Sequence, residues 1–366
     1  MTIGIDGNEA NVAAQVGVSV YTHQLLHHFA RLATEREQFL VYLRRAPLDS
    51  MPPENDFFKY RIVKGRFLWS QIFLPFELYM HKDIDIFFAP AHYAPRYCPV
   101  PIVVTIHDLS FFYFPNEFLQ KDLYQLKNWT AYSIKKAKRI IAVSKTTKKD
   151  ILKLYGVPDT QIDMVYNGFE KKIDKDEPIT VLDKYNLHTG KYILYVGTIQ
   201  PRKNLKTLIQ AYDIFLKNNP GYKLVLTGKK GWMFEETLEA AQEHLKTKEI
   251  LITGYETDEN VIELYKNAFC YCLPSLYEGF GIPILEAMSN NCPVITSHTS
   301  SLPEIGGDAC LYFDPRDPQE LAAKLSQLHD NENLKQELIK KGKERVTQFS
   351  WKKSAIETLD VIRYCL

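Results

Sequence analysis

The chain has 366 residues, of which 45% are hydrophobic and 24% are charged. This length predicts two folded domains, and this composition excludes a wholly disordered protein. The formal net charge of +1 argues against a general nucleic-acid-binding protein, because such proteins need many basic residues to neutralise phosphates. The sequence has no apolar run of about 18 residues and opens without a basic and then apolar leader. We therefore expect no membrane span, no secretory signal and a cytoplasmic location.

The first half of the chain alternates short apolar runs with amphipathic stretches. Apolar residues recur about every 3.6 positions at residues 19–33, which predicts a helix. Strands are predicted where β-branched or aromatic runs end in turn-forming or polar residues, at residues 3–7, 39–43, 84–90, 101–108 and 139–144. This alternation predicts a parallel sheet with helices on both faces.

A second set of runs follows a charged, turn-rich segment near residues 169–178. Strands are predicted at residues 192–197, 222–228, 249–254, 268–275, 292–297 and 310–315, with helices from about residues 204 and 235. The predicted fold class is therefore α/β, with two Rossmann-like, doubly wound domains at residues 1–170 and 171–349 that face a central cleft. An amphipathic helix at residues 350–366 packs either on the second domain or back on the first.

The segment YEGFGIPILEAM, at residues 277–288, follows a predicted strand and opens a predicted helix. Its two glycines let the backbone approach a ligand closely, and the free N–H groups of the first helical turn favour an anion. Pro283 suits the first helical position, because its missing N–H costs nothing there. Glu286 is then expected in the first helical turn, where the helix dipole by itself favours an acidic residue.

Over EGFGIPILEAM and its continuation PVITSHTSSLPEIGGDACLYFDP, the chain resembles the retaining GT-B glycosyltransferases of family 4, whose signature is two glutamates separated by seven residues. The resemblance covers the C-terminal domain and patches of the N-terminal domain. It implies an acceptor-binding N-terminal domain and a nucleotide-sugar-binding C-terminal domain. It also implies transfer of a hexosyl group from a nucleotide-diphosphate sugar to a saccharide or lipid-linked saccharide, without a metal ion or a cofactor.

The resemblance assigns Glu278 to hydroxyl groups of the donor sugar, as a candidate catalytic residue, and Glu286 to the nucleotide ribose. A carboxylate only accepts hydrogen bonds, so it suits hydroxyl groups and repels phosphate. Backbone amides of the turn would face the phosphates or the sugar, around Gly279, Phe280, Gly281 and Ile282. We therefore expect the acids to bind the sugar rings, and the amides and nearby cations to bind the diphosphate between them.

The cations are predicted after the strand that ends at Gly197. The resemblance assigns Lys203 to the diphosphate and makes Arg202 a second positive charge, so both are candidate catalytic residues. Many family members carry an arginine directly after the strand-end glycine, where this chain has Thr198. Asn204 is predicted to cap the helix that follows.

Further contacts are predicted at other strand ends. The resemblance places the nucleobase against backbone groups of Gly254 and Tyr255. Gly228 and Lys229, which follow another predicted strand, are expected to border the nucleotide. The resemblance places Gly17 against the diphosphate, although most members have two glycines in that loop and this chain has one. His107 is a candidate catalytic residue that hydrogen-bonds the sugar or orients the acceptor, whereas a histidine at a strand end is otherwise more often structural.

Two polar patterns have structural interpretations. Ser301 with Glu304 fits a capping box at a helix start. Asp83 and Asp85 have the Asp-x-Asp form of a metal site found in another glycosyltransferase fold, but they lead into a strand that reads as buried, so we predict no metal site. The six cysteines lack the second close pair of ligands that a zinc site needs, and we expect buried thiols.

Residues 111–150 contain nine lysines or arginines and three acidic residues. This stretch is either a core-facing helix with a solvated basic side or a surface that docks anionic lipid, where each basic residue contributes roughly 1 kcal/mol. The second interpretation makes the protein peripheral at the inner face of a membrane.

The donor is predicted from two further stretches. GTIQPRKNL and SSLPEIGGDA resemble mannosyltransferases, which favours GDP-mannose over UDP-sugars. Two alternatives stay open, a UDP-sugar-dependent glucosyl- or galactosyltransferase and a nucleotide-sugar-binding protein without transfer activity.

Overall fold

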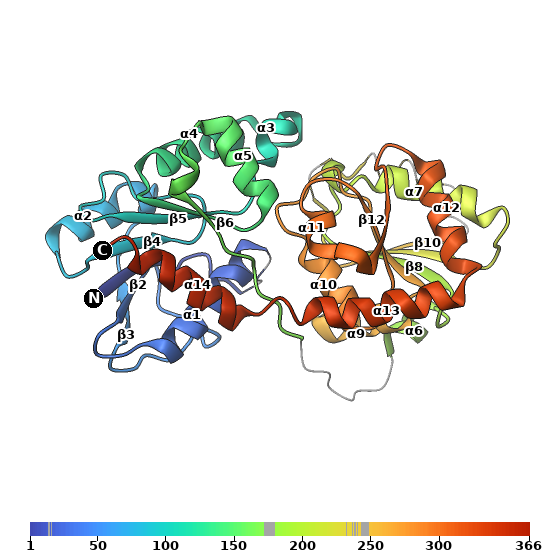
Figure 1. Cartoon of the computed structure of the whole chain (residues 1–366), viewed down its shortest axis with the longest axis horizontal. Helices are drawn as coiled ribbons and strands as arrows, with labels where there is room; N and C mark the ends of the chain where they lie inside the picture. The colour runs from blue at the N-terminus through green and yellow to red at the C-terminus, as the bar shows by residue number, and fades with distance from the viewer. Residues whose placement is uncertain are drawn as a thin grey trace. The chain divides into compact units, whose positions relative to one another are not determined.

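Figure 1 shows the computed structural model, in which the chain forms two compact units. The first unit comprises Met1–Gly168 and Phe349–Leu366, and the second comprises Phe169–Gln348. The structure describes residues 1–13, 15, 17–171, 180–231, 233–235, 237, 239, 241–242 and 249–366. The predicted domain boundary near residues 169–178 lies mostly outside the described residues.

The first unit is built on seven parallel strands in the order β3-β2-β1-β4-β5-β6-β7. They are β1 (Thr2–Asp6), β2 (Gln38–Leu43), β3 (Phe58–Ile62), β4 (Ile86–Ala89), β5 (Ile102–Ile106), β6 (Arg139–Ala142) and β7 (Ile162–Met164). The five strands predicted for this half are confirmed. The two edge strands have no counterpart in the prediction, because β3 carries Lys59 and Arg61 among its apolar residues and β7 is only three residues long.

Helices cover both faces of this sheet. α1 (Val18–Leu32) and α14 (Trp351–Arg363) pack on one face. The longer elements on the other face are α2 (Phe73–Met80), α4 (Gln120–Lys136) and α5 (Lys145–Tyr155). The short elements of this unit are η1 (Trp69–Gln71), α3 (Ser110–Tyr113), η2 (Pro115–Glu117) and η3 (Asp159–Gln161). Because side chains alternate along a strand, Phe88 enters one core and Phe87 the other.

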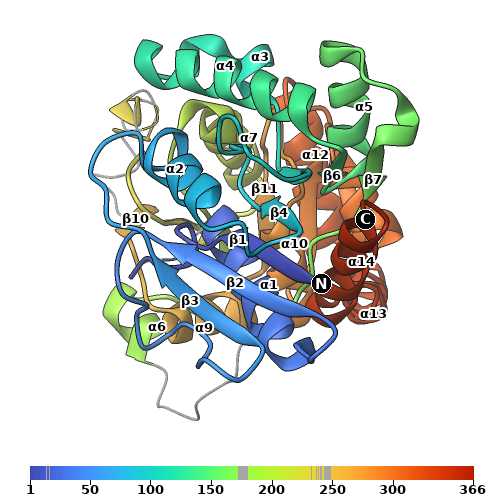
Figure 2. The ribbon, with the colours of Figure 1, turned by 90° about the vertical axis from the view of Figure 1, so that its left-hand side faces the viewer.

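The C-terminal helix α14 packs beside α1, as Figure 2 shows. The Trp351 ring meets that of Tyr21 edge-on, with 6.0 Å between the ring centroids. Arg363 donates two hydrogen bonds, of 2.9 and 2.7 Å, to the Glu37 carboxylate. Gly168 permits this packing, because a Cβ atom there would lie 2.1 Å from the Trp351 backbone nitrogen. The sequence left two packing sites possible for this helix, the second domain or the first. In the structure it packs on the first unit.

The second unit has six parallel strands in the order β10-β9-β8-β11-β12-β13. They are β8 (Tyr192–Val196), β9 (Lys223–Thr227), β10 (Ile250–Gly254), β11 (Cys270–Leu273), β12 (Val294–Ser297) and β13 (Cys310–Phe313), all predicted. The helices are α6 (Thr180–Tyr185), α7 (Leu205–Leu216), α9 (Asp258–Asn267), α10 (Ile282–Ser289), α11 (Leu302–Gly306), α12 (Pro318–His329) and α13 (Glu332–Val346), with η4 (Pro201–Lys203) and η5 (Gly307–Ala309). The helix predicted from about residue 235 falls largely outside the described residues. Within the described ranges, no helix has both the length and the apolar character needed to cross a bilayer.

Three strands of the second unit end at glycines whose backbones lie against one another. The Gly197 N–H donates to the Thr227 carbonyl at 2.9 Å, and the Gly228 N–H donates to the Gly254 carbonyl at 2.8 Å. Gly228 has a φ of 145°, and a Cβ atom there would lie 2.0 Å from the Gly197 carbonyl oxygen. Only glycine fits at position 228, which lets the backbones that follow β8 and β9 approach each other closely.

Candidate active site

The turn between β11 and α10 is held by two serines that follow β12. The Ser301 hydroxyl is fully buried and donates to the carbonyls of Glu278, at 2.9 Å, and Phe280, at 2.7 Å. The Glu278 N–H donates to the Ser300 hydroxyl at 2.8 Å. Gly281 has a φ of 112°, which directs the chain into α10 at a conformation that favours glycine. These contacts fix the backbone of the turn before any ligand binds.

The interpretation of Ser301 as the start of a capping box is wrong. α11 begins at Leu302 without a side-chain cap, because the serine hydroxyl is committed to the turn carbonyls. The prediction that Asn204 caps α7 is also wrong. Its side-chain amide donates to the Pro274 carbonyl at 3.1 Å and the Pro315 carbonyl at 2.6 Å, which ties the start of α7 to the ends of β11 and β13.

Glu278 lies in a buried cluster with the two predicted cations. The Lys203 ammonium is 2.5 Å from Glu278 Oε1, and the Arg202 guanidinium is 3.5 Å from Glu278 Oε2. The side chains of all three are only 13–14% exposed. Arg202 also donates to the Tyr277 carbonyl, and the Ser275 hydroxyl donates to Glu278 Oε1 at 2.6 Å. Among these three side chains the two basic groups outnumber the carboxylate by one, and an excess of positive charge favours an anion.

The surroundings of Glu278 keep its carboxylate ionised. Burial by itself would raise its pKa, but the charges of Lys203 and Arg202 and the hydrogen bonds from Lys203 and Ser275 hold the pKa below its usual value. The carboxylate therefore acts as a hydrogen-bond acceptor for hydroxyl groups and positions both cations. The structure thus brings Glu278 to Arg202 and Lys203, which precede it by 76 and 75 residues in the sequence.

Glu286 lies one turn into α10, not in its first turn as predicted, because the helix begins at Ile282 and has no acidic residue in the first turn. Pro283 is accordingly its second residue. The Tyr265 hydroxyl, on the neighbouring α9, donates to Glu286 Oε2 at 3.3 Å. Helix-dipole stabilisation falls off within the first turn, so it is a weak reason for a carboxylate here.

The candidate nucleobase contacts lie beside the glycines at the carboxyl ends of β8, β9 and β10. The Gly254 carbonyl accepts from Gly228, as described above. Tyr255 is 63% exposed, and the Lys229 ammonium lies 5.1 Å from the centroid of its ring. The phenol ring and the lysine therefore form an exposed, cationic border after β9 and β10.

In the first unit, His107 follows β5 and is buried as a neutral imidazole. Burial lowers its pKa to about 3, as does the nearby His92, and the Pro90 carbonyl and Asp108 offset this only in part. Its Nε2 lies 2.7 Å from the Pro90 carbonyl, which can only accept, so Nε2 carries the proton. At neutral pH the His107 imidazole is therefore uncharged, and its hydrogen bond to the Pro90 carbonyl holds the ring in place.

We expect His107 to make the stability of the protein depend on pH. An unfolded histidine binds a proton near pH 6.5, whereas folded His107 stays neutral down to about pH 3. Between these values the unfolded state binds more protons, so this contribution is complete above pH 6.5 and is lost, by at most about 1.4 kcal/mol per pH unit, as the pH falls. Urea denaturation at several pH values should show a flatter dependence for His107→Gln than for the exposed control His188→Gln. Equal slopes would contradict this assignment.

His92 was not singled out in the sequence, although it lies two residues after the predicted strand 84–90. It has a φ of 59°, which is unusual for a residue other than glycine. The His107 N–H donates to His92 Nε2 at 3.4 Å, which leaves the proton on Nδ1. That Nδ1 is buried and has no hydrogen-bond partner among the described residues. Strained backbone and an unpaired polar atom are features of functional positions.

Gly17 belongs to the same unit and lies directly before α1. Its φ is 51°, and no atom lies within 4 Å of the position that a Cβ would take. This left-handed backbone conformation favours glycine at position 17. A contact between Gly17 and the diphosphate stays a prediction.

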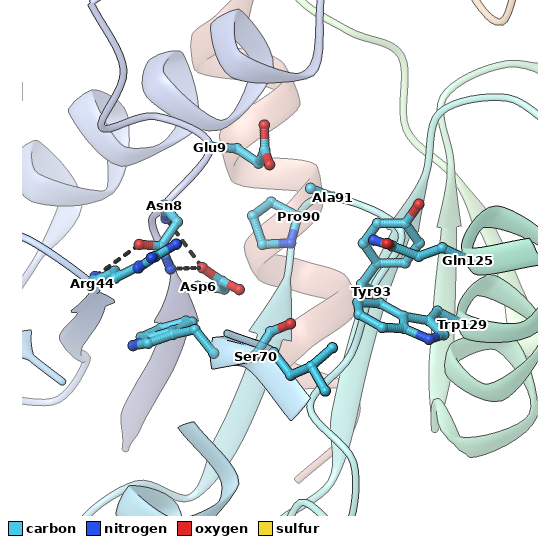
Figure 3. A pocket seen from close by; sticks show the side chains of 12 residues that line it. Asp6, Asn8, Glu9, Arg44, Ser70, Pro90, Ala91, Tyr93, Gln125 and Trp129 are labelled. Carbon is cyan, nitrogen blue, oxygen red and sulfur yellow. Dashed lines mark hydrogen bonds between the residues drawn. The ribbon is translucent and has the colours of Figure 1, made fainter. Parts of the chain in front are cut away.

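The first unit also has a pocket of about 360 Å³ at the carboxyl ends of β1 and β4. Figure 3 shows Asp6 and Arg44 on one side of this pocket, and Tyr93 and Trp129 on the other. The rings of Tyr93 and Trp129 meet edge-on at 5.5 Å. Burial raises the pKa of Asp6 to about 6, against the hydrogen bonds from Asn8. A pocket with aromatic rings and acidic groups suits a ligand rich in hydroxyl groups better than an anion.

The Asp-x-Asp pair lies away from the carboxyl ends of the strands. Asp83 binds Arg61 at 2.6 Å, and Asp85 accepts from the Thr2 N–H at 2.7 Å, both before β4. Among the described residues, no group of three or more histidines, cysteines, aspartates or glutamates could hold a metal ion.

The sequence and the fold of this chain are similar to those of known proteins. Residues 16–172 match the family model described as "Glycosyltransferase Family 4", and residues 181–345 match "Glycosyl transferases group 1". The O-antigen chain mannosyltransferase B of Escherichia coli is 32% identical over 337 residues, which are 90% of this chain and 84% of that protein. The chain belongs to glycosyltransferase family 4. The predicted enzyme class, a hexosyltransferase with a nucleotide-sugar donor and a saccharide acceptor, is therefore confirmed.

This family 4 glycosyltransferase has further relatives. The O-antigen chain mannosyltransferase RfbU of Salmonella typhimurium is 31% identical over 216 residues, 58% of this chain and 57% of that protein. WaaG, a glycosyltransferase involved in lipopolysaccharide biosynthesis, superposes with a TM-score of 0.74 at 14% identity over 99% of both chains. A sucrose-phosphate synthase from Thermosynechococcus elongatus superposes with a TM-score of 0.75 at 18% identity, over 99% of this chain and 98% of that one. These structures confirm the predicted GT-B fold class.

Proposed function

We propose that this family 4 glycosyltransferase transfers mannose from GDP-mannose to a saccharide or lipid-linked saccharide, with retention of the anomeric configuration. The buried cluster of Glu278, Lys203 and Arg202 beside the glycine-containing turn carries this proposal. It combines an acceptor for sugar hydroxyl groups with a net positive charge for a diphosphate. Relatives named as O-antigen mannosyltransferases support mannose as the sugar.

In this proposal, the donor is held by groups of opposite kinds. The two cations and the amides around Gly279–Ile282 bind the diphosphate, Glu278 accepts from hydroxyl groups of the hexose, and Glu286 accepts from the ribose. The bond from the anomeric carbon to the diphosphate oxygen breaks as a bond to the acceptor oxygen forms on the same face. The proton of the acceptor hydroxyl passes to the departing diphosphate. The protein accelerates transfer by positioning the reactants and by stabilising charge on the leaving group, without a metal ion.

The identity of the donor can be tested by how strongly each nucleotide sugar stabilises the folded protein. GDP-mannose should raise the melting temperature more than UDP-glucose, UDP-galactose or ADP-glucose at equal concentration, with or without a chelator, because a ligand that binds the folded state stabilises it. Glu286→Ala should weaken GDP-mannose binding by about 10- to 100-fold, since it removes a hydrogen bond to a charged group. Glu337→Ala, an exposed change on α13, is the control. A larger shift with a UDP-sugar contradicts the donor. Binding without release of GDP when acceptor is added contradicts transfer.

The acceptor is proposed to bind in the pocket of the first unit. Its carboxylates, Asp6 and Glu9, accept from hydroxyl groups, and the rings of Tyr93 and Trp129 offer apolar surface to a sugar. Glu9→Gln should raise the acceptor KM about tenfold and leave the donor KM unchanged, because a charged acceptor of hydrogen bonds becomes neutral. Initial-rate kinetics against Glu35→Gln, an exposed control in the same unit, measure this. Equal acceptor KM values would place the acceptor elsewhere.

We also propose that exposed lysines of residues 111–150 contact an anionic membrane at its inner face. Several basic residues of this stretch serve the fold: Arg139 binds Asp163 at 2.5 Å, and Lys148 binds Asp159 at 2.9 Å. Lys121, Lys135 and Lys136, near the two ends of α4, are exposed and can make such a contact, as can the exposed Lys149 on α5.

A further inference from the structure

The first unit exposes a set of large apolar side chains on the residues that flank η1 and on α2. These side chains, which we call the apolar patch, are Phe67, Leu68, Ile72, Phe73, Phe76, Tyr79 and Met80. Phe67, Phe76 and Met80 are 74%, 68% and 64% exposed. The opposite side of α2 is also apolar, because Leu74 and Leu78 are fully buried in the core. Large apolar side chains that gather on one exposed helix face indicate a binding surface.

The patch is presented on a well-anchored segment. Trp69, which is 6% exposed, donates its indole N–H to the Val63 carbonyl at 2.6 Å. Gln71 donates to the Ala94 carbonyl at 3.3 Å, which ties the segment to the loop after β4. Leu68 has a φ of 51°, an unfavourable conformation for a leucine. The backbone is therefore strained at Leu68, in a segment whose Phe67 and Leu68 side chains are exposed to solvent.

The charges beside the patch decide what it binds. Its two acidic neighbours share one basic partner within the fold: Arg61 lies 3.8 Å from Glu77 and 2.6 Å from Asp83. The basic neighbours are exposed and have no acidic partner among the described residues; they are Lys64, Arg66 and Lys82. The surface therefore combines apolar side chains with an excess of positive charge. A second copy of the same face would bring these like charges together, whereas an anionic lipid surface complements both features.

We propose that the apolar patch inserts into the interfacial region of an anionic bilayer, with Lys64, Arg66 and Lys82 at the lipid headgroups. α2 packs on the same face of the sheet as α4, as in Figure 2. The patch thus extends the membrane contact proposed for the α4 lysines and adds the apolar part that those lysines lack. This membrane proposal depends on the proposed function only in that a lipid-linked acceptor would explain it. Its test measures vesicle binding and does not depend on hexosyl transfer.

The test is co-sedimentation of the full chain with vesicles of phosphatidylcholine, alone or mixed with phosphatidylglycerol. The wild type should bind the anionic vesicles at least about tenfold more strongly than the neutral ones. Phe76→Ser with Met80→Ser should lose about tenfold or more, and so should Lys64→Gln with Arg66→Gln and Lys82→Gln. All of these side chains are exposed, so the variants should fold, which circular dichroism checks. Leu366→Ser, an equally exposed apolar residue of the same unit, should bind as the wild type does.

Three outcomes would overturn the proposal. The first is equal binding of wild type and the double serine variant. The second is loss of binding only in Lys121→Gln with Lys135→Gln and Lys136→Gln, which would assign the contact to α4 alone. The third is a wild-type dimer in sedimentation velocity that the double serine variant abolishes, without vesicle binding, which would make the patch a contact between copies. Transfer to a water-soluble saccharide, measured in parallel, should be unchanged in the double serine variant. Its absence in the wild type would count against the proposed function and leave the vesicle result standing.

Discussion

Lys203→Met is expected to lower the rate of hexosyl transfer by about two to three orders of magnitude, the usual effect of removing one group that stabilises a leaving charge. The Lys203 ammonium is already held by Glu278 at 2.5 Å and is 14% exposed, so little reorganisation is needed when the diphosphate departs. Methionine preserves much of the apolar stem and removes the charge. The measurement is kcat with saturating donor and acceptor.

The control for Lys203→Met is Lys206→Met, an exposed position on α7 three residues further on. It should transfer at the wild-type rate. Both proteins are compared below the onset of their thermal unfolding, so that loss of folded protein does not count as loss of catalysis. A Lys203→Met enzyme that retains half of the wild-type kcat would show that the leaving group is not stabilised at this cluster.

Glu278→Gln is expected to destabilise the folded protein by about 3 kcal/mol at pH 7 and to weaken transfer, because it leaves two buried cations without their carboxylate. The wild-type contribution depends on pH. The folded pKa of Glu278 is lowered, so this stability is complete above the ordinary value near 4.5 and is lost as the pH falls through the lowered pKa. The difference in unfolding free energy between wild type and variant should therefore shrink on acidification. Urea denaturation at pH 7 and pH 4 measures it.

A double-mutant cycle separates the ion pair from the site as a whole. Lys203→Met combined with Glu278→Gln should be less destabilised than the sum of the single changes, by roughly 1–3 kcal/mol, because the two groups are in contact. Additive effects would mean that Lys203 and Glu278 do not interact in solution. Glu337→Gln serves as the control for the loss of a carboxylate in the same unit.

Much of the candidate site was predictable because its residues are local in sequence. The run from Glu278 to Glu286 specifies a turn and a helix through its two glycines and Pro283, and strands that end in glycine specify where the sheet edge lies. The interpretation of Ser301 failed because the pattern of serine and glutamate suits a capping box, whereas the hydroxyl was needed by carbonyls more than 20 residues earlier. The sequence around Ser301 does not show that these distant carbonyls compete with the backbone N–H groups of α11 for its hydroxyl.

The surfaces of the first unit were less predictable. Residues 67–80 read as apolar, which usually indicates a core, and only the fold shows that one side of α2 stays in solvent. Asp6, Glu9 and Trp129 carry no shared motif, and only the fold brings the end of β1 and the helix α4 to the same pocket.

By itself, the sequence determined the two α/β halves, the central strands of each sheet and the turn that carries the two glutamates, because hydrophobic period and turn chemistry act over a few residues. Only the tertiary structure decided that Lys203 and Arg202 meet Glu278, that α14 returns to the first unit and that the patch on α2 is uncovered. These depend on contacts between segments tens to hundreds of residues apart, whose pairing is selected by packing of the whole domain and not by any local preference.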